Sequence, residues 1–151
     1  MNKDSICIIE DKPIIAEYYK ILLKQASFTH ITIKTSFKQF IEDKQNHSLY
    51  IIDITIKNKD DGIKIGEYVH KKNKNIIFCS AHTNNYYLTK SQHLHAIAFF
   101  TKPLYESYFI KFLTMYNEKT YPKSVTYCSP QNHIRHLKWT ETPSLNKDKP
   151  I

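Results

Sequence analysis

Tyr50-Ile51-Ile52-Asp53 is an apolar run that ends in a carboxylate and is followed by a polar loop. Three further runs end in the same way: residues 6–9 lead into Glu10-Asp11, residues 76–79 into Ser80, and residues 96–100 into Thr101-Lys102-Pro103. Short, nearly continuous hydrophobic runs are typical of parallel strands that are covered on both faces. Because the carboxyl ends of parallel strands share one edge, where open α/β sheets bind ligands, the sequence predicts a site at that edge.

Strand-like and helix-like segments alternate five times along the chain. This alternation predicts an α/β fold with a doubly wound, five-stranded parallel sheet flanked by five helices. Residues 30–34 alternate between polar and apolar side chains, which favours an edge strand. The predicted strands are 5–9, 30–34, 49–53, 76–79 and 96–100, and the predicted helices are 13–26, 36–46, 62–73, 84–93 and 104–117.

The chain has 151 residues, which favours one domain with a sizeable core. We assign residues 1–119 to this domain, because the fifth strand–helix unit is complete by Tyr116. Residues 120–151 are rich in proline and polar side chains, and we expect a tail without an independent fold. One short amphipathic piece in it, residues 134–139, is expected to dock on the domain.

The composition excludes a disordered chain, since 41% of the residues are hydrophobic and 13% are aromatic. The apolar stretch that follows Met1-Asn2-Lys3-Asp4 is too short for a signal peptide or a membrane span. The three cysteines form no C-x-x-C pair, and Cys7 and Cys79 fall inside predicted buried strands. We therefore expect a cytoplasmic protein that does not insert into a membrane.

The net charge of +8 allows two interpretations. Lysine and arginine can prepare a surface for nucleic acid or for acidic partners. However, the lysines are spread along the chain, with no basic run longer than Lys71-Lys72. We favour a generally lysine-rich protein and do not expect nucleic acid to be bound directly.

Over about residues 4–117, the chain resembles the receiver domain of two-component response regulators. Glu10-Asp11 resembles the acidic pair of that family, Asp53 its phosphoacceptor, Ser80-Ala81 its Thr/Ser-Ala motif and Lys102-Pro103 its Lys-Pro motif. Asp61-Gly62-Ile63 also resembles the family's loop into the third helix. The resemblance implies a flavodoxin-like fold with the strand order 2-1-3-4-5.

The same resemblance implies a phosphorelay protein. Asp53 would accept a phosphoryl group from a sensor histidine kinase or a phosphotransfer protein, and would later lose it by hydrolysis. Lys102 would pair with Asp53 before the reaction and with the phosphoryl oxygens afterwards, and the Ser80 hydroxyl would donate to one of those oxygens. Such a protein assists its own phosphorylation and dephosphorylation but is not a conventional enzyme.

Mg²⁺, or Mn²⁺, is the cofactor that the resemblance implies. Its ligands would be Glu10, Asp11, Asp53 and the backbone carbonyl of Thr55. Ser80 and Phe99 would then form a switch that repacks the surface of segments 84–93, 96–100 and 104–117. That surface is expected to bind a downstream protein or a second copy of the chain.

Each motif alone also has a plain interpretation as an ordinary turn or cap, and the whole pattern leaves alternatives open. A receiver-like scaffold could bind partners without phosphorylation, and a basic protein could bind nucleic acid. A haloacid-dehalogenase-type phosphatase would need a second aspartate two residues after Asp53, where the chain has Thr55. His133 and His136, with Cys128 upstream, lack a fourth metal ligand, so we do not assign a metal site to them.

Overall fold

The computed structural model describes residues 2–56, 61–131 and 133–141. The strands are β1 (Asn2–Ile9), β2 (Phe28–Lys34), β3 (Leu49–Asp53), β4 (Asn75–Ser80), β5 (Ala98–Thr101), β6 (Val125–Cys128) and β7 (Ile134–Leu137). The helices are α1 (Pro13–Gln25), α2 (Phe37–Glu42), α3 (Asp61–Lys71), α4 (Asn85–His93) and α5 (Glu106–Glu118). None of the helices in these ranges has the length and apolarity needed to cross a membrane.

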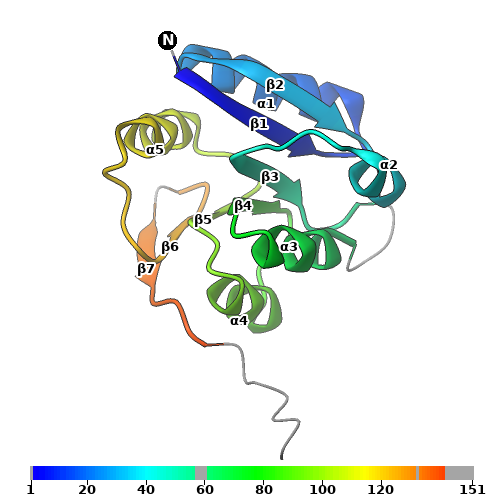
Figure 1. Ribbon diagram of the computed structural model, residues 1–151. Coiled ribbons are helices and arrows are strands. Elements are labelled where there is room, and N and C mark those ends of the chain that lie inside the picture. Colours follow the sequence, from blue (N-terminus) through cyan, green and yellow to red (C-terminus); the bar gives the residue numbers. More distant parts are fainter. Residues whose placement is uncertain (1, 57–60, 132, 142–151) are drawn as a thin grey trace, which may run out of the picture.

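The strands form one sheet in the order β2-β1-β3-β4-β5-β6-β7 (Figure 1). The first five strands pair in parallel, so the predicted order 2-1-3-4-5 and the five flanking helices are confirmed. Strand β2 lies at one edge of the sheet, as its mixed polar and apolar pattern predicts.

Two apolar clusters cover the two faces of the sheet. Alternate residues of β1 point to opposite faces: Ile6 and Ile8 pack with α1 and α5, whereas Cys7 and Ile9 pack with α2, α3 and α4. Strand β3 is buried along its whole length, which explains why its sequence is a continuous apolar run. Because β3 is buried on both faces, its position in the sheet is fixed, and so is the position of Asp53 at its carboxyl end.

Helix α2 is shorter than predicted. It ends at Glu42 and not at residue 46, because Asp43 adopts an extended backbone with φ −72° and ψ 120°. The Asp43 side chain accepts a hydrogen bond from the Gln45 amide at 2.9 Å, a local turn that competes with helix continuation. The segment between α2 and β3 is therefore a loop, and its His47 side chain reaches Ser5 of β1.

The sheet is longer than the predicted five strands. After α5 the chain adds β6 parallel to β5, and β7 returns antiparallel to β6. Val125 and Cys128 of β6 are buried in the apolar clusters on the two faces of the sheet, so β6 contributes to the core. The part of the predicted tail that lies in residues 142–151 falls outside the described residues.

The segment after β7 docks on the domain, as expected for residues 134–139. The Trp139 indole nitrogen donates to the Ala96 carbonyl at 2.7 Å, and its ring stacks on His95 with a centroid distance of 5.0 Å. The Gln92 side chain donates to the Lys138 carbonyl at 2.8 Å. These contacts hold the end of the described chain against α4 and the segment between α4 and β5.

Candidate functional site

The candidate site lies where β1, β3, β4 and β5 end at the carboxyl edge of the sheet. Glu10 and Asp11 follow β1, Asp53 closes β3, Ser80 closes β4, and Lys102 follows β5. The strand register places Asp53 beside Cys79 and Ser80 beside Thr101. The common end of these strands thus gathers the predicted residues from positions far apart in the sequence.

An ion-paired group forms the centre of this site. The Lys102 ammonium nitrogen, Nζ, lies 3.1 Å from Glu10 Oε1 and 3.1 Å from Asp53 Oδ2. The Glu10 side chain is fully buried, that of Asp53 is 3% exposed, and that of Lys102 is 19% exposed. One cation therefore bridges two carboxylates that have little contact with solvent.

Burial and charge shift the pKa values of this group. Burial and the neighbouring Asp53 charge raise the pKa of Glu10 to about 7, although Lys102 opposes the shift. Burial alone would lower the pKa of Lys102, but Asp53 and Glu10 together raise it above its usual value. Lys102 therefore stays charged, whereas Glu10 is partly protonated near pH 7.

Three carboxylates at this edge could share a cation. One oxygen each from Glu10, Asp11 and Asp53 lie within 4.8 Å of one another. Carboxylate oxygens are the ligands that Mg²⁺ and Mn²⁺ prefer. This donor set fits such an ion, whereas it has no sulfur or imidazole that would favour a softer metal.

The loop after β3 holds the Asp53 carboxylate in place. The Thr55 amide donates to Asp53 Oδ1 at 3.1 Å, and the Thr55 hydroxyl lies 3.4 Å from the same oxygen. The Gly62 amide donates to the Ile54 carbonyl at 3.0 Å, and a Cβ on Gly62 would clash with the backbone of Asp53 and Ile54. The start of α3 can approach β3 this closely only because residue 62 is glycine.

The two predicted switch residues are both fully buried. The Ser80 hydroxyl accepts a hydrogen bond from the His82 amide at 3.0 Å. The Phe99 ring stacks on Tyr127 of β6 with a centroid distance of 6.0 Å, and it also lies 6.5 Å from the Phe78 ring. The sequence did not predict Tyr127 as a partner of Phe99, although the β-branched and aromatic run Val125-Thr126-Tyr127 could have indicated a strand.

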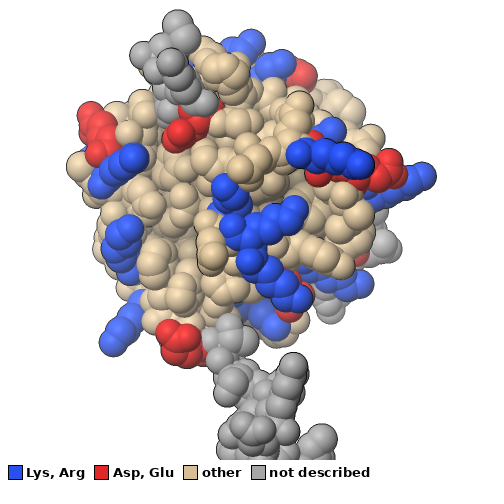
Figure 2. Space-filling model, viewed as in Figure 1, with Lys and Arg blue, Asp and Glu red and all other residues tan. Residues whose placement is uncertain are grey.

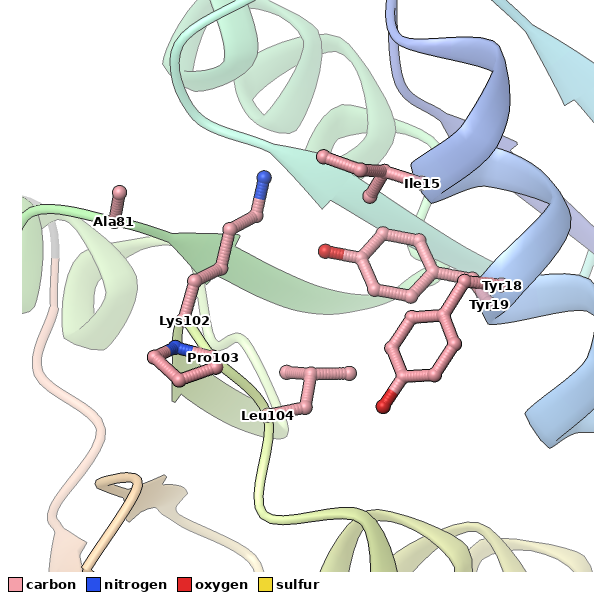
Figure 3. A pocket seen from close by; sticks show the side chains of 7 residues that line it. All are labelled: Ile15, Tyr18, Tyr19, Ala81, Lys102, Pro103 and Leu104. Carbon is pink, nitrogen blue, oxygen red and sulfur yellow. The ribbon is translucent and has the colours of Figure 1, made fainter.

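An apolar pocket of about 520 Å³ lies beside Lys102. Figure 3 shows Lys102, Pro103 and Leu104 on one side of it, with Ile15, Tyr18 and Tyr19 of α1 on the other. The Tyr18 hydroxyl donates to Glu106 Oε2 at 2.6 Å and so links α1 to α5. The sequence predicts a helix over residues 13–26, but no sequence signal indicates a pocket beside it.

Charged side chains are dispersed on the face of the molecule shown in Figure 2. Lysine and arginine side chains lie apart or in one small group near the middle of the view, and acidic side chains lie among them. A nucleic-acid site commonly shows a continuous basic stripe. This face therefore gives no support to a nucleic-acid interface.

The model of the response regulator receiver domain family matches residues 6–114 of the chain. The matched segment includes all five candidate residues from Glu10 to Lys102 and ends before β6. Among curated proteins, none matches the sequence significantly.

Solved structures share the fold at low sequence identity. A response regulator receiver domain protein (CheY-like) from Methanospirillum hungatei JF-1 is 16% identical with a TM-score of 0.69, and the match covers 79% of this chain and 97% of that chain. The signal receiver domain of a DNA-binding response regulator from Colwellia psychrerythraea 34H is 20% identical with a TM-score of 0.69, over 77% and 99% of the two chains. The receiver domain of the Francisella response regulator 1452 is 19% identical with a TM-score of 0.66, over 78% and 99%. At these identities the likeness shows the fold alone.

Proposed function

The chain belongs to the response regulator receiver domain family, and on that basis we propose that Asp53 accepts a phosphoryl group in a two-component phosphorelay. The observation that carries the proposal is the buried bridge from Lys102 to Glu10 and Asp53. A nucleophilic carboxylate needs a nearby cation when a phosphoryl group arrives, because negative charge accumulates around the transferred phosphorus. Lys102 is positioned to supply that charge.

The residues around Asp53 have distinct parts in this reaction. An Asp53 oxygen attacks phosphorus, and the bond between phosphorus and the donor breaks as the acyl phosphate forms. The Lys102 ammonium shifts from the Asp53 carboxylate to the negatively charged phosphoryl oxygens. The Ser80 hydroxyl leaves the His82 amide and donates to one of these oxygens. Water later attacks the acyl phosphate and restores Asp53.

Glu10, Asp11 and Asp53 would hold Mg²⁺ or Mn²⁺, with the Thr55 backbone carbonyl as a further ligand. The bound ion would neutralise phosphoryl oxygens and orient the phosphoryl group. The proximity of the three carboxylates supports this assignment. Lys102 would then share its two carboxylate partners with the ion.

A sensor histidine kinase or phosphotransfer protein is the proposed phosphodonor partner. Its docking surface would be α1, where Ile14 is 86% exposed and Ile21 is 54% exposed. These exposed apolar side chains lie on the helix that also lines the pocket beside Lys102. A donor that covers α1 would bring its phosphohistidine over the carboxyl edge of the sheet and exclude water from it. We place this exchange in the cytoplasm, where the free cysteines Cys7, Cys79 and Cys128 would stay reduced.

The surface that would bind a downstream protein or a second copy of the chain is that of α4, β5 and α5, extended in this protein by β6 and β7. Because β6 pairs with β5, the exposed edge of the sheet on this side is β7, and a partner would contact β7 and not β5. Tyr127 covers the buried Phe99 ring. Movement of Ser80 and Phe99 on phosphorylation would therefore push first on the β6–β7 hairpin.

The stacking of Tyr127 on Phe99 also favours a second candidate, a scaffold that binds partners without phosphorylation, because it holds the switch position covered when no phosphoryl group is present. Incubation with acetyl phosphate and Mg²⁺, read by intact mass, distinguishes the two. We expect one added phosphoryl group in the native chain and none in Asp53→Asn. Failure of the native chain to gain mass, or equal labelling of Asp53→Asn, would contradict phosphoacceptance at Asp53.

A further inference from the structure

A second cluster of metal-binding side chains lies away from the phosphoacceptor. Cys7 of β1, Asp43 at the end of α2 and His47 in the following loop each bring one ligand atom within 4.8 Å of the others. Cys7 and His47 are fully buried, and the Asp43 side chain is only 8% exposed. Cys7 precedes Glu10 by three residues on an extended strand, or about 10 Å, so the two clusters are separate.

The early end of α2 creates this cluster. Asp43 is extended, and His47 in the loop after it reaches Ser5 of β1. The His47 ring also packs edge-on against Tyr50, with a centroid distance of 5.4 Å. A helix that continued to residue 46, as the sequence predicts, would not return His47 to Cys7 in this way.

Hydrogen bonds fix the orientation of His47. Its Nδ1 atom lies 2.6 Å from the Ser5 hydroxyl, and its Nε2 atom lies 2.7 Å from Asp43 Oδ2. A metal-binding histidine commonly donates from one ring nitrogen to a neighbouring oxygen, which leaves the lone pair of the other nitrogen for the metal. Ser5 is positioned to accept from Nδ1, so that Nε2 can face Asp43 and Cys7.

We propose that Cys7, Asp43 and His47 bind a zinc-class divalent cation. Sulfur, imidazole and carboxylate ligands suit Zn²⁺ or Co²⁺, whereas Mg²⁺ prefers oxygen ligands only. A thiolate and a carboxylate carry two negative charges, which balance the ion and make its burial favourable. Asp43 is the least buried of the three, so the fourth position opens toward water on its side.

The proton balance of binding is simple. The Cys7 thiol loses its proton to solvent and becomes the thiolate ligand. Without a metal, the imidazole proton lies on Nε2, where it is donated to Asp43 Oδ2. On binding, the ring takes the other neutral tautomer: its single proton lies on Nδ1 and is donated to Ser5 Oγ, and Nε2 binds the ion. Without a metal, burial holds the pKa of Cys7 at about 12, so the thiol stays protonated. Metal binding would join β1 to the loop between α2 and β3.

Cobalt provides the test, because a thiolate bound to Co²⁺ gives a charge-transfer absorption that carboxylate sites do not give. We expect one equivalent of Co²⁺ to produce this band in the reduced full-length chain, and Zn²⁺ to displace it. Cys7→Ser should lose the band, and Asp43→Asn should weaken Co²⁺ binding by at least about tenfold. Cys128→Ser is the matched control, since Cys128 is also buried but lies in β6.

Two results would overturn the proposal: no charge-transfer band in the native chain, or a band that persists in Cys7→Ser. Asp53→Asn should keep the band, which separates this site from the phosphoacceptor. If Cys7→Ser fails to fold, Asp43→Asn decides, and unchanged Co²⁺ affinity in that variant would contradict the assignment.

Discussion

Lys102 bridges two neighbouring carboxyl groups whose negative charges would otherwise repel each other in a nearly dry environment. Its ammonium is equidistant from Glu10 and Asp53 at 3.1 Å, and both acids are almost completely buried. Removing one partner from a buried ion pair leaves the other charge uncompensated. Lys102 therefore contributes to folding as well as to the proposed phosphoryl transfer, and a test of its role in transfer has to verify the fold of the variant.

For Lys102→Ala we expect a folded protein with slower phosphorylation. The loss of the ammonium removes the charge that would stabilise the incoming phosphoryl group, and we expect the rate to fall by at least about tenfold. The measurement is the rate of mass increase with acetyl phosphate, with circular dichroism to verify the fold. Lys111→Ala is the control, because Lys111 is an exposed residue of α5. A native labelling rate in Lys102→Ala would contradict this role.

Asp11 is expected to matter for the cation and not for the core. Since its carboxylate is one of three within 4.8 Å, Asp11→Ala should weaken Mg²⁺ binding by at least about tenfold, or roughly 1.4 kcal/mol. A Mg²⁺ titration followed by nuclear resonances near Glu10 and Asp53 measures this change. Glu42→Ala removes an exposed carboxylate elsewhere and should leave the affinity unaltered. Equal affinities in all three proteins would remove Asp11 from the site.

At the scale of elements, the β6–β7 hairpin lies between the buried switch position and any partner at that edge. Tyr127 stacks on Phe99, and the segment after β7 is fixed by the Trp139 indole on Ala96. The chain has a single tryptophan, so the fluorescence of Trp139 reports on this segment alone.

Phosphorylation of the native chain should change Trp139 emission, because a shift of Phe99 displaces Tyr127 and the hairpin behind it. Tyr127→Ala removes the contact and should reduce the emission change by at least half, while Asp53 still labels. Tyr86→Ala is a suitable control, since Tyr86 is an exposed ring of α4. Constant Trp139 emission at full labelling would show that the hairpin does not respond.

The elements that the sequence predicts well are those with strong local signals. Leu49–Asp53 and Asn75–Ser80 are continuous apolar runs with polar ends, so both strands and the edge at which Asp53 and Ser80 lie could be predicted. Val125–Cys128 is also buried at both ends, but prolines and polar residues flank it in the sequence, and these indicate a tail. Its burial depends on the open edge of β5, which is a tertiary feature. The approach of His47 to Cys7 likewise could not be predicted from the sequence, because it depends on a local turn at Asp43.

On the scale of the whole molecule, β6 and β7 extend the sheet beyond residue 119. Because the sequence assigns the domain to residues 1–119, it predicts that a chain ending at Lys119 folds by itself. In the structure, that chain would lose Val125 and Cys128 from the two apolar clusters and would uncover Phe99 and the edge of β5. An uncovered strand edge next to exposed apolar side chains also favours aggregation.

We therefore expect a chain ending at Lys119 to be less stable than the full chain by at least about 3 kcal/mol, since burial of each medium-sized apolar side chain contributes about 1.5–3 kcal/mol. A chain ending at Glu141 keeps β6, β7 and the Trp139 contacts, so it should unfold at nearly the same urea concentration as the full chain. Urea unfolding followed by circular dichroism compares the three lengths without dependence on Trp139. Equal midpoints for the chains ending at Lys119 and Glu141 would show that the core is complete by α5. In that case the hairpin would serve recognition alone, and its contact with Phe99 would add little to folding.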